Sequence, residues 1–134
     1  MADLGFNHSP YMRFLGLRMI RSERGLVEIQ LPFREEFIRG DGSDWLHGGV
    51  VSALVDIVGD YAVITELGPG VPTIDLRVDY HSAAMPGDLT VRGKVVRMGS
   101  QFSTAEAQVF DQAGKLLASG RGTYFTAPLP VPKG

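Results

Sequence analysis

The carboxylate of Asp56 is the feature of this sequence that most strongly suggests chemistry. It lies in residues 45–64, where apolar residues cover nearly every side of a predicted helix. An ionised carboxylate buried there without a partner costs several kcal/mol, which is on the order of the whole stability margin of a domain. Asp56 therefore either pairs with a cation such as Arg77 or with backbone donors, or it takes part in a reaction. We favour the reaction.

Asp60 follows Asp56 by one helical turn and could form a carboxylate pair or half of a metal site. No histidine has a suitable spacing to complete such a site, so we predict no metal and no cofactor. The chain has no cysteine, which excludes disulfides, thiolate nucleophiles and thiolate metal sites.

The 134 residues carry a formal net charge of -2 and are 44% hydrophobic, as expected of one soluble domain that spans residues 1–134. No basic excess is present, so we expect no nucleic-acid partner. The first residues lack the charged and apolar regions of a signal peptide. Asp56 and Asp60 interrupt the longest apolar stretch, so we predict no membrane segment and a cytoplasmic protein.

The elements that must position these residues follow from periodicity and capping. Ser9, Pro10 and Gly16 have the types and order that start and end a short helix at about 9–16. Strands are predicted at 17–20 and 26–31, a loop at 32–44, and the long helix next. Residues 73–81 alternate polar and apolar side chains as a strand does, and three more strands are predicted at 89–98, 102–110 and 115–126. An extended tail is expected at about 127–134.

This order predicts an α+β fold in which a curved antiparallel sheet wraps around one long central helix. A helix that is apolar all round must be enclosed, and a single sheet leaves one side of it open. A second copy of the chain is the simplest closure. We therefore expect a homo-oligomer, either a dimer or a dimer of dimers.

The residues around the helix start resemble the signature of hotdog-fold acyl-CoA thioesterases, specifically the PaaI-like group of the phenylacetate pathway. The run LHGGV at 46–50 is followed, nine residues after its histidine, by the acid of LVD at 54–56. The similarity extends from about Phe14 to Phe125 and includes GVPTIDL at 70–76 and YHSAAMPGD at 80–88. The resemblance implies a hotdog fold and an enzyme that hydrolyses an acyl-CoA to a carboxylic acid and free CoA.

The resemblance also implies roles for individual residues. Asp56 corresponds to the family's nucleophile or general base, and the backbone amide of Gly48 to the group that polarises the thioester carbonyl. Thr73 corresponds to a hydroxyl residue that helps to place water. Asp41 stands where some members carry an asparagine or another amide, six residues before the histidine. It either binds water, stays protonated, or belongs to a loop that aligns differently.

The residue types suit this chemistry. The first amides of a helix have no partners within it and lie at the positive end of its dipole, so they can hold a developing oxyanion. Gly48 and Gly49 have no side chains and let a substrate approach. His47 is also expected at the substrate, and a packing or capping role is favoured over that of a general base. Arg97 and Ser100, in a predicted hairpin, are the candidates for contacting CoA phosphates.

Spacing alone adds an inference about assembly. Asp56 is eight residues beyond Gly48, or roughly 12 Å along a helix, so one thioester carbonyl cannot touch both groups of the same chain. Two antiparallel helices in a dimer would bring Gly48 of one copy near Asp56 of the other. Two other functions stay open, which are a non-catalytic acyl-CoA sensor and a hotdog acyl-thioester dehydratase or hydratase. The acyl group is not predictable from the sequence.

Overall fold

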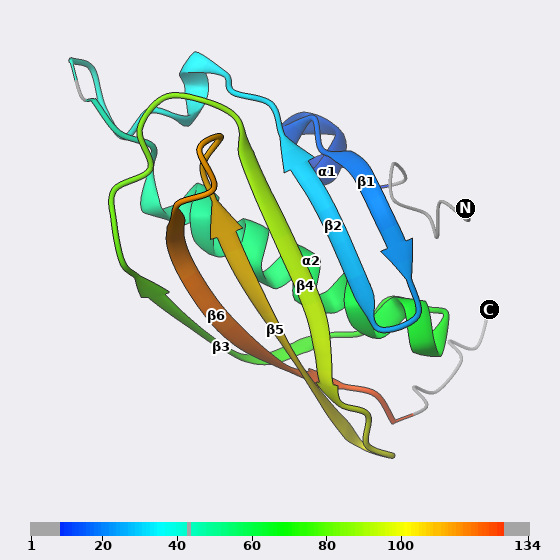
Figure 1. Ribbon diagram of the computed structural model, residues 1–134. Coiled ribbons are helices and arrows are strands. Elements are labelled where there is room, and N and C mark those ends of the chain that lie inside the picture. Colours follow the sequence, from blue (N-terminus) through cyan, green and yellow to red (C-terminus); the bar gives the residue numbers. More distant parts are fainter. Residues whose placement is uncertain (1–8, 43, 128–134) are drawn as a thin grey trace.

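The computed structural model describes residues 9–42 and 44–127, and these residues form one sheet with one long helix across it (Figure 1). The predicted hotdog architecture is confirmed. In chain order the elements are α1 Pro10–Leu15, β1 Arg18–Glu23, β2 Leu26–Leu31, the 3₁₀ turn η1 Glu35–Phe37, α2 Gly48–Leu67, β3 Thr73–Tyr80, β4 Leu89–Arg97, β5 Phe102–Phe110 and β6 Leu116–Phe125. Of the tail predicted at about 127–134, residues 128–134 lie outside the described residues.

The six strands are all antiparallel and are arranged in the order β1-β2-β4-β5-β6-β3. The sheet curves, and α2 lies across its concave face (Figure 1). Strand β2 buries alternate residues, as a strand with one face on a core should. Between β2 and its sheet neighbour β4, the chain forms α2 and β3. Strand β3 pairs with β6 and lies at the opposite edge of the sheet from β1. The strand that directly follows α2 is therefore an edge strand.

The short first helix has the caps that its sequence predicts. The Ser9 side chain accepts a hydrogen bond from the Met12 backbone N–H, and Pro10 occupies the first helical position. Gly16 ends the helix with φ of 75°, a left-handed conformation that glycine adopts without steric cost. Leu15 is buried, so α1 is fixed against the rest of the molecule.

Two glycines let the sheet approach α2 closely. A Cβ built at Gly93 of β4 would lie 2.6 Å from the Val58 carbonyl oxygen, and one at Gly120 of β6 would lie 2.7 Å from Val55 Cγ1. Both separations are too short for a real side chain, so only glycine fits at these positions. The helix therefore rests directly on the backbone of the sheet.

The structure differs from the sequence prediction at the long helix. It begins at Gly48 rather than at residue 45, because His47 adopts an extended conformation and caps the first turn. Asp56 is half-buried rather than enclosed, since the side of α2 away from the sheet is only partly covered in a single chain. Among residues 9–42 and 44–127, no helix is long and apolar enough to cross a membrane.

Candidate active site

The carboxylate of Asp56 is held by β3. Thr73 Oγ1, at the first residue of that strand, donates a hydrogen bond of 2.7 Å to Asp56 Oδ1. The Tyr124 hydroxyl donates to the backbone carbonyl of Asp56 at 3.2 Å and so fixes the helix at this turn. The structure thus brings together two of the residues that the sequence proposes for the site, Asp56 and Thr73.

Asp60 is the more deeply placed of the two carboxylates on α2. Burial raises its pKa from 3.8 to about 7, the Val71 backbone N–H lowers it, and the charge of Asp56 adds to the rise. Its Oδ1 is buried and has no hydrogen-bond partner. The pair is therefore unequal: Asp56 has a hydroxyl donor on one oxygen, whereas Asp60 keeps its proton up to about neutral pH.

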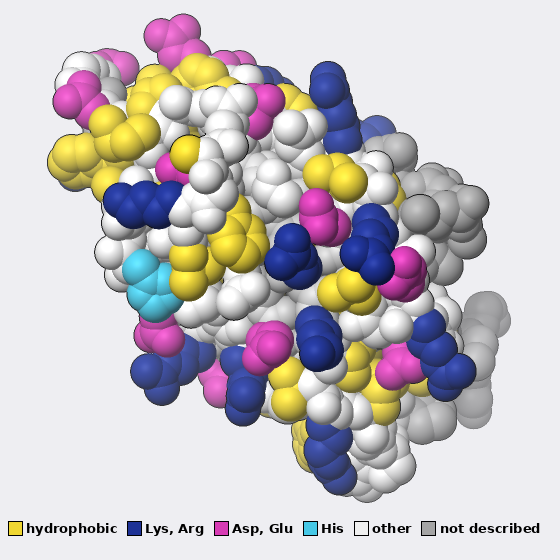
Figure 2. Space-filling model, viewed as in Figure 1, with side chains coloured by type: hydrophobic (Ala, Val, Ile, Leu, Met, Phe, Trp, Pro, Cys, Tyr) yellow, Lys and Arg dark blue, Asp and Glu magenta, His cyan; other side chains and the backbone are white. Residues whose placement is uncertain are grey.

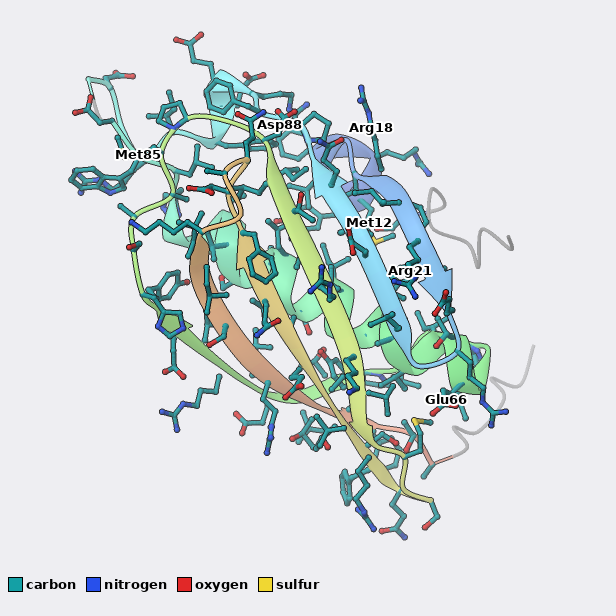
Figure 3. The ribbon with its side chains drawn as sticks, in the orientation of Figure 1. Met12, Arg18, Arg21, Glu66, Met85 and Asp88 are labelled. Atoms are coloured by element: carbon teal, nitrogen blue, oxygen red, sulfur yellow. The ribbon has the colours of Figure 1, made fainter. Side chains whose placement is uncertain are left out.

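Both carboxylates line a hollow of about 280 Å³ between α1 and α2. Its remaining lining residues are Ser9, Met12, Ile57, Tyr61, Ile64 and Gly70. Figure 3 labels Met12, which comes from α1. A mostly apolar hollow beside a carboxylate with a fixed hydrogen bond is suited to hold an apolar group next to a reacting centre.

The glycine amides lie at the other end of the helix. His47 Nδ1 accepts a hydrogen bond of 2.8 Å from the Gly49 N–H, so the histidine caps α2. The N–H of Gly48 donates to no acceptor among the residues that the structure describes. The Tyr80 hydroxyl, at the last residue of β3, donates to the Gly48 carbonyl at 2.7 Å. Of the two predicted glycine amides, that of Gly48 is thus available to a ligand.

A second hollow, of about 360 Å³, opens at this helix start. Its walls include Trp45, Gly48, Tyr80 and His81, and His81 Nε2 lies 2.8 Å from Ser119 Oγ. This hollow shares no lining residue with the hollow beside Asp56. Within one chain, Gly48 and Asp56 therefore line different cavities, which agrees with their separation along the helix.

The other predicted site residues lie apart from both hollows. Asp41 is exposed in the turn before α2. Arg97, at the end of β4, and Ser100, in the β4–β5 hairpin, are also exposed, and this hairpin lies away from the helix start (Figure 1). None of these three residues lines the hollow beside Asp56 or the hollow at Gly48. Their predicted roles in water or CoA binding stay predictions.

The outer face of the sheet carries cations and carboxylates side by side, and Figure 2 shows them intermixed across this view. The register places Lys94 opposite Glu106, and Glu106 opposite Arg121. Charges of both signs thus alternate across neighbouring strands instead of forming one basic patch on this face.

Two tyrosines contribute to the site without having been predicted for it. Tyr80 contacts Gly48 across 32 residues of sequence, and Tyr124 contacts Asp56 across 68. Tyr80 stands at an apolar position of the alternating strand, which predicts packing but not the reach of its hydroxyl. Neither contact leaves a signal in the local sequence.

A curved antiparallel sheet around one long helix, with a carboxylate in mid-helix and two glycines at the helix start, is the architecture of a hotdog protein. Comparison with known families agrees, because residues 45–118 match the model of the Thioesterase superfamily. The chain belongs to this superfamily.

Individual relatives support the same assignment. Acyl-coenzyme A thioesterase 13 of Homo sapiens is 32% identical over 118 residues, which cover 84% of this chain and 82% of the relative. A solved structure from the thioesterase superfamily is 42% identical, covers 90% of this chain and 91% of its own, and superimposes with a TM-score of 0.85. The fold is shared by the E. coli PaaI protein from the phenylacetic acid degradation operon. That protein is 20% identical and superimposes with a TM-score of 0.83, covering 92% of this chain and 88% of its own.

Proposed function

We propose that this protein hydrolyses acyl-CoA thioesters, with Asp56 as the general base or nucleophile and the Gly48 amide as the oxyanion donor. The hydrogen bond from Thr73 to Asp56, beside a ligand-sized hollow in a member of the Thioesterase superfamily, is the observation that carries the proposal. The human relative, which is named as an acyl-coenzyme A thioesterase, supports CoA as the thiol.

The chemistry needs one attacking oxygen and one site for negative charge. With Asp56 as base, the oxygen of water bonds to the thioester carbonyl carbon while a water proton passes to the carboxylate. The carbonyl oxygen becomes negative and accepts a hydrogen bond from the Gly48 N–H. The C–S bond then breaks, and the CoA thiolate takes up a proton. Free CoA and a carboxylic acid leave.

We further propose that the complete site forms between two copies of the chain. Both halves of the site adjoin β3, since Thr73 at its start contacts Asp56 and Tyr80 at its end contacts Gly48. Pairing of two β3 strands antiparallel across a twofold axis would place the start of one strand beside the end of the other. Asp56 of one copy would then face Gly48 of its partner, and two equivalent sites would result.

The surface of β3 fits such a contact. It is an edge strand, and its unpaired backbone groups can accept another strand. Ile74 and Tyr80 of β3 are large apolar side chains, yet 57% and 55% of their surfaces are exposed in the single chain. A second copy would cover these side chains, and it would also cover the open side of α2.

The first test replaces Asp56 with asparagine. We expect the turnover of an acyl-CoA panel, followed by thiol release, to fall about 10²–10⁴-fold, because asparagine cannot take a proton. Binding of a non-hydrolysable thioether analogue should persist. A sensor would bind without any turnover in the unsubstituted protein, and a hydratase would instead consume an enoyl-CoA without releasing thiol. Undiminished turnover in Asp56→Asn would contradict the proposal.

The second test removes the amide of Gly48. Proline fits the first position of a helix and has no N–H, and the extended conformation of His47, with ψ of 134°, suits a residue before proline. Gly48→Pro should therefore keep the helix and lose about 10²–10³-fold in turnover. Gly48→Ala is the matched control, because its Cβ would lie at an ordinary 3.6 Å from Tyr80 and its N–H remains.

Mixing the two inactive variants tests the shared site. A dimer that combines Asp56→Asn with Gly48→Pro has one site with both defects and one site with neither. Random exchange of subunits should therefore restore about a quarter of the normal activity. A site built within one chain would stay inactive after mixing, and that result would refute the arrangement between copies.

A further inference from the structure

Asp60 is a half-buried carboxylate with one fully buried oxygen, and the proposed mechanism does not use it. It follows Asp56 by one turn, so both side chains lie on the same side of α2. Its Oδ1 has no hydrogen-bond partner, although a buried polar atom normally has one. A carboxyl group whose buried oxygen lacks a hydrogen bond lowers the stability of the fold.

The hollow beside Asp56 gives Asp60 a defined neighbourhood. Met12, Ile57 and Ile64 supply apolar walls, and the two carboxylates lie on the same lining. A volume of about 280 Å³ is close to the lower end of small-molecule sites. An acyl group whose thioester carbonyl is presented to Asp56 would extend along this lining and pass Asp60.

Resting on the proposed thioesterase function, we propose that Asp60 is a specificity-determining residue whose charge state decides whether the hollow accepts an apolar acyl group. A neutral carboxyl group can lie against a hydrocarbon chain at modest cost. An ionised one would lose its remaining water when the acyl group covers it, and the Val71 N–H offsets this desolvation only in part. Ionised Asp60 therefore excludes apolar acyl groups.

The charge state of Asp60 changes near neutral pH. Burial raises its pKa to about 7, and the groups that face it explain the direction. Asp56 on the same helix adds a negative charge, the Val71 backbone N–H between α2 and β3 opposes the shift, and Tyr124 of β6 stays a neutral phenol because burial and both carboxylates raise its pKa. Asp60 is thus neutral below about pH 7 and charged above it.

The expected size of the effect follows from the neutral fraction. If only the form with neutral Asp60 binds an apolar acyl group, the apparent Kd is the intrinsic Kd divided by that fraction. With a pKa of about 7, the neutral fraction falls from about nine-tenths at pH 6 to about one-tenth at pH 8. The Kd for an apolar acyl group should therefore rise about tenfold between these values.

The experiment measures binding of S-hexyl-CoA, a thioether that cannot be hydrolysed, by calorimetry at pH 6 and pH 8. Free CoA is measured in parallel, because its phosphates titrate as well. The Kd for S-hexyl-CoA divided by the Kd for free CoA isolates the contribution of the alkyl group. We expect this ratio to rise about tenfold in the unsubstituted protein and to stay constant in Asp60→Asn, which cannot ionise. Asp60→Leu serves as a second uncharged variant should the amide fail to fold.

Glu106→Gln is the control for loss of a carboxylate, since Glu106 is exposed on β5 and lines neither the Asp56 nor the Gly48 hollow. It should behave as the unsubstituted protein does. A flat ratio in the unsubstituted protein, or a tenfold rise that persists in Asp60→Asn, would overturn the inference. Turnover of Asp56→Asn is measured separately, so failure of the thioesterase proposal is distinguishable from failure of this one.

Discussion

Replacing Gly93 with alanine tests the contact that sets the position of the helix and therefore of Asp56. A Cβ at this position of β4 would lie 2.5 Å from Val58 Cγ1 and 2.6 Å from the Val58 carbonyl oxygen. Nonbonded carbon atoms prefer separations of about 3.5–4.0 Å, so sheet and helix would have to separate by about 1 Å. Rotation of the Val58 side chain cannot relieve the contact with its backbone oxygen.

Overpacking of this kind costs about 1–3 kcal/mol, and the backbone contact places Gly93→Ala toward the upper end. Alanine also lowers the conformational entropy of the unfolded chain, which raises the free energy of unfolding by about 0.4–1 kcal/mol. We therefore expect the free energy of unfolding to fall by about 2 kcal/mol. Urea denaturation followed by circular dichroism, at one fixed protein concentration, measures this change.

Gly40→Ala is the matched control. A Cβ at Gly40 would meet nothing within 4 Å, and this glycine does not have a positive φ. Its free energy of unfolding should stay within about 0.5 kcal/mol of the original value. Turnover should also drop in Gly93→Ala, because Val58 lies next to the turn that carries Asp56. A Gly93→Ala protein as stable as the control would refute the close packing of α2 on the sheet.

Two further predictions concern charge and assembly. Asp60 has a folded pKa of about 7, above its usual 3.8, so the folded protein holds a proton that the unfolded chain has lost, and stability falls as pH rises from about 4 through 7. Asp60→Asn should remove roughly 2–4 kcal/mol of this fall in the free energy of unfolding. Urea denaturation at pH 5 and pH 8 measures the change. Identical pH dependence in both proteins would contradict the burial of Asp60. Ile74→Lys places a charge on the exposed apolar edge of β3 and should yield a monomer by sedimentation and no turnover by thiol release. An active, unchanged oligomer would exclude this edge as the interface.

The sequence by itself predicted those features whose causes are local. Ser9 and Gly16 bound α1 through capping, and the alternation at 26–31 and 73–80 predicts strands that the structure contains. The motif around His47 indicated the family, which the comparisons confirm. The apolar pattern predicts a helix from residue 45, before the observed start at Gly48, because the residues before His47 continue that pattern although the backbone there is not helical.

Only the tertiary structure decided which side chains meet. Thr73 reaches Asp56 across 17 residues and Tyr80 reaches Gly48 across 32, because β3 returns along the helix as an edge strand after the other strands have paired elsewhere. The apolar helix predicts burial of Asp56, yet Asp60 is the carboxylate with the raised pKa and the unpartnered oxygen. Helical periodicity gives the direction of a side chain around its axis. How deeply that side chain is covered depends on which strands and loops pack over it, and the pattern within one segment contains no information about them.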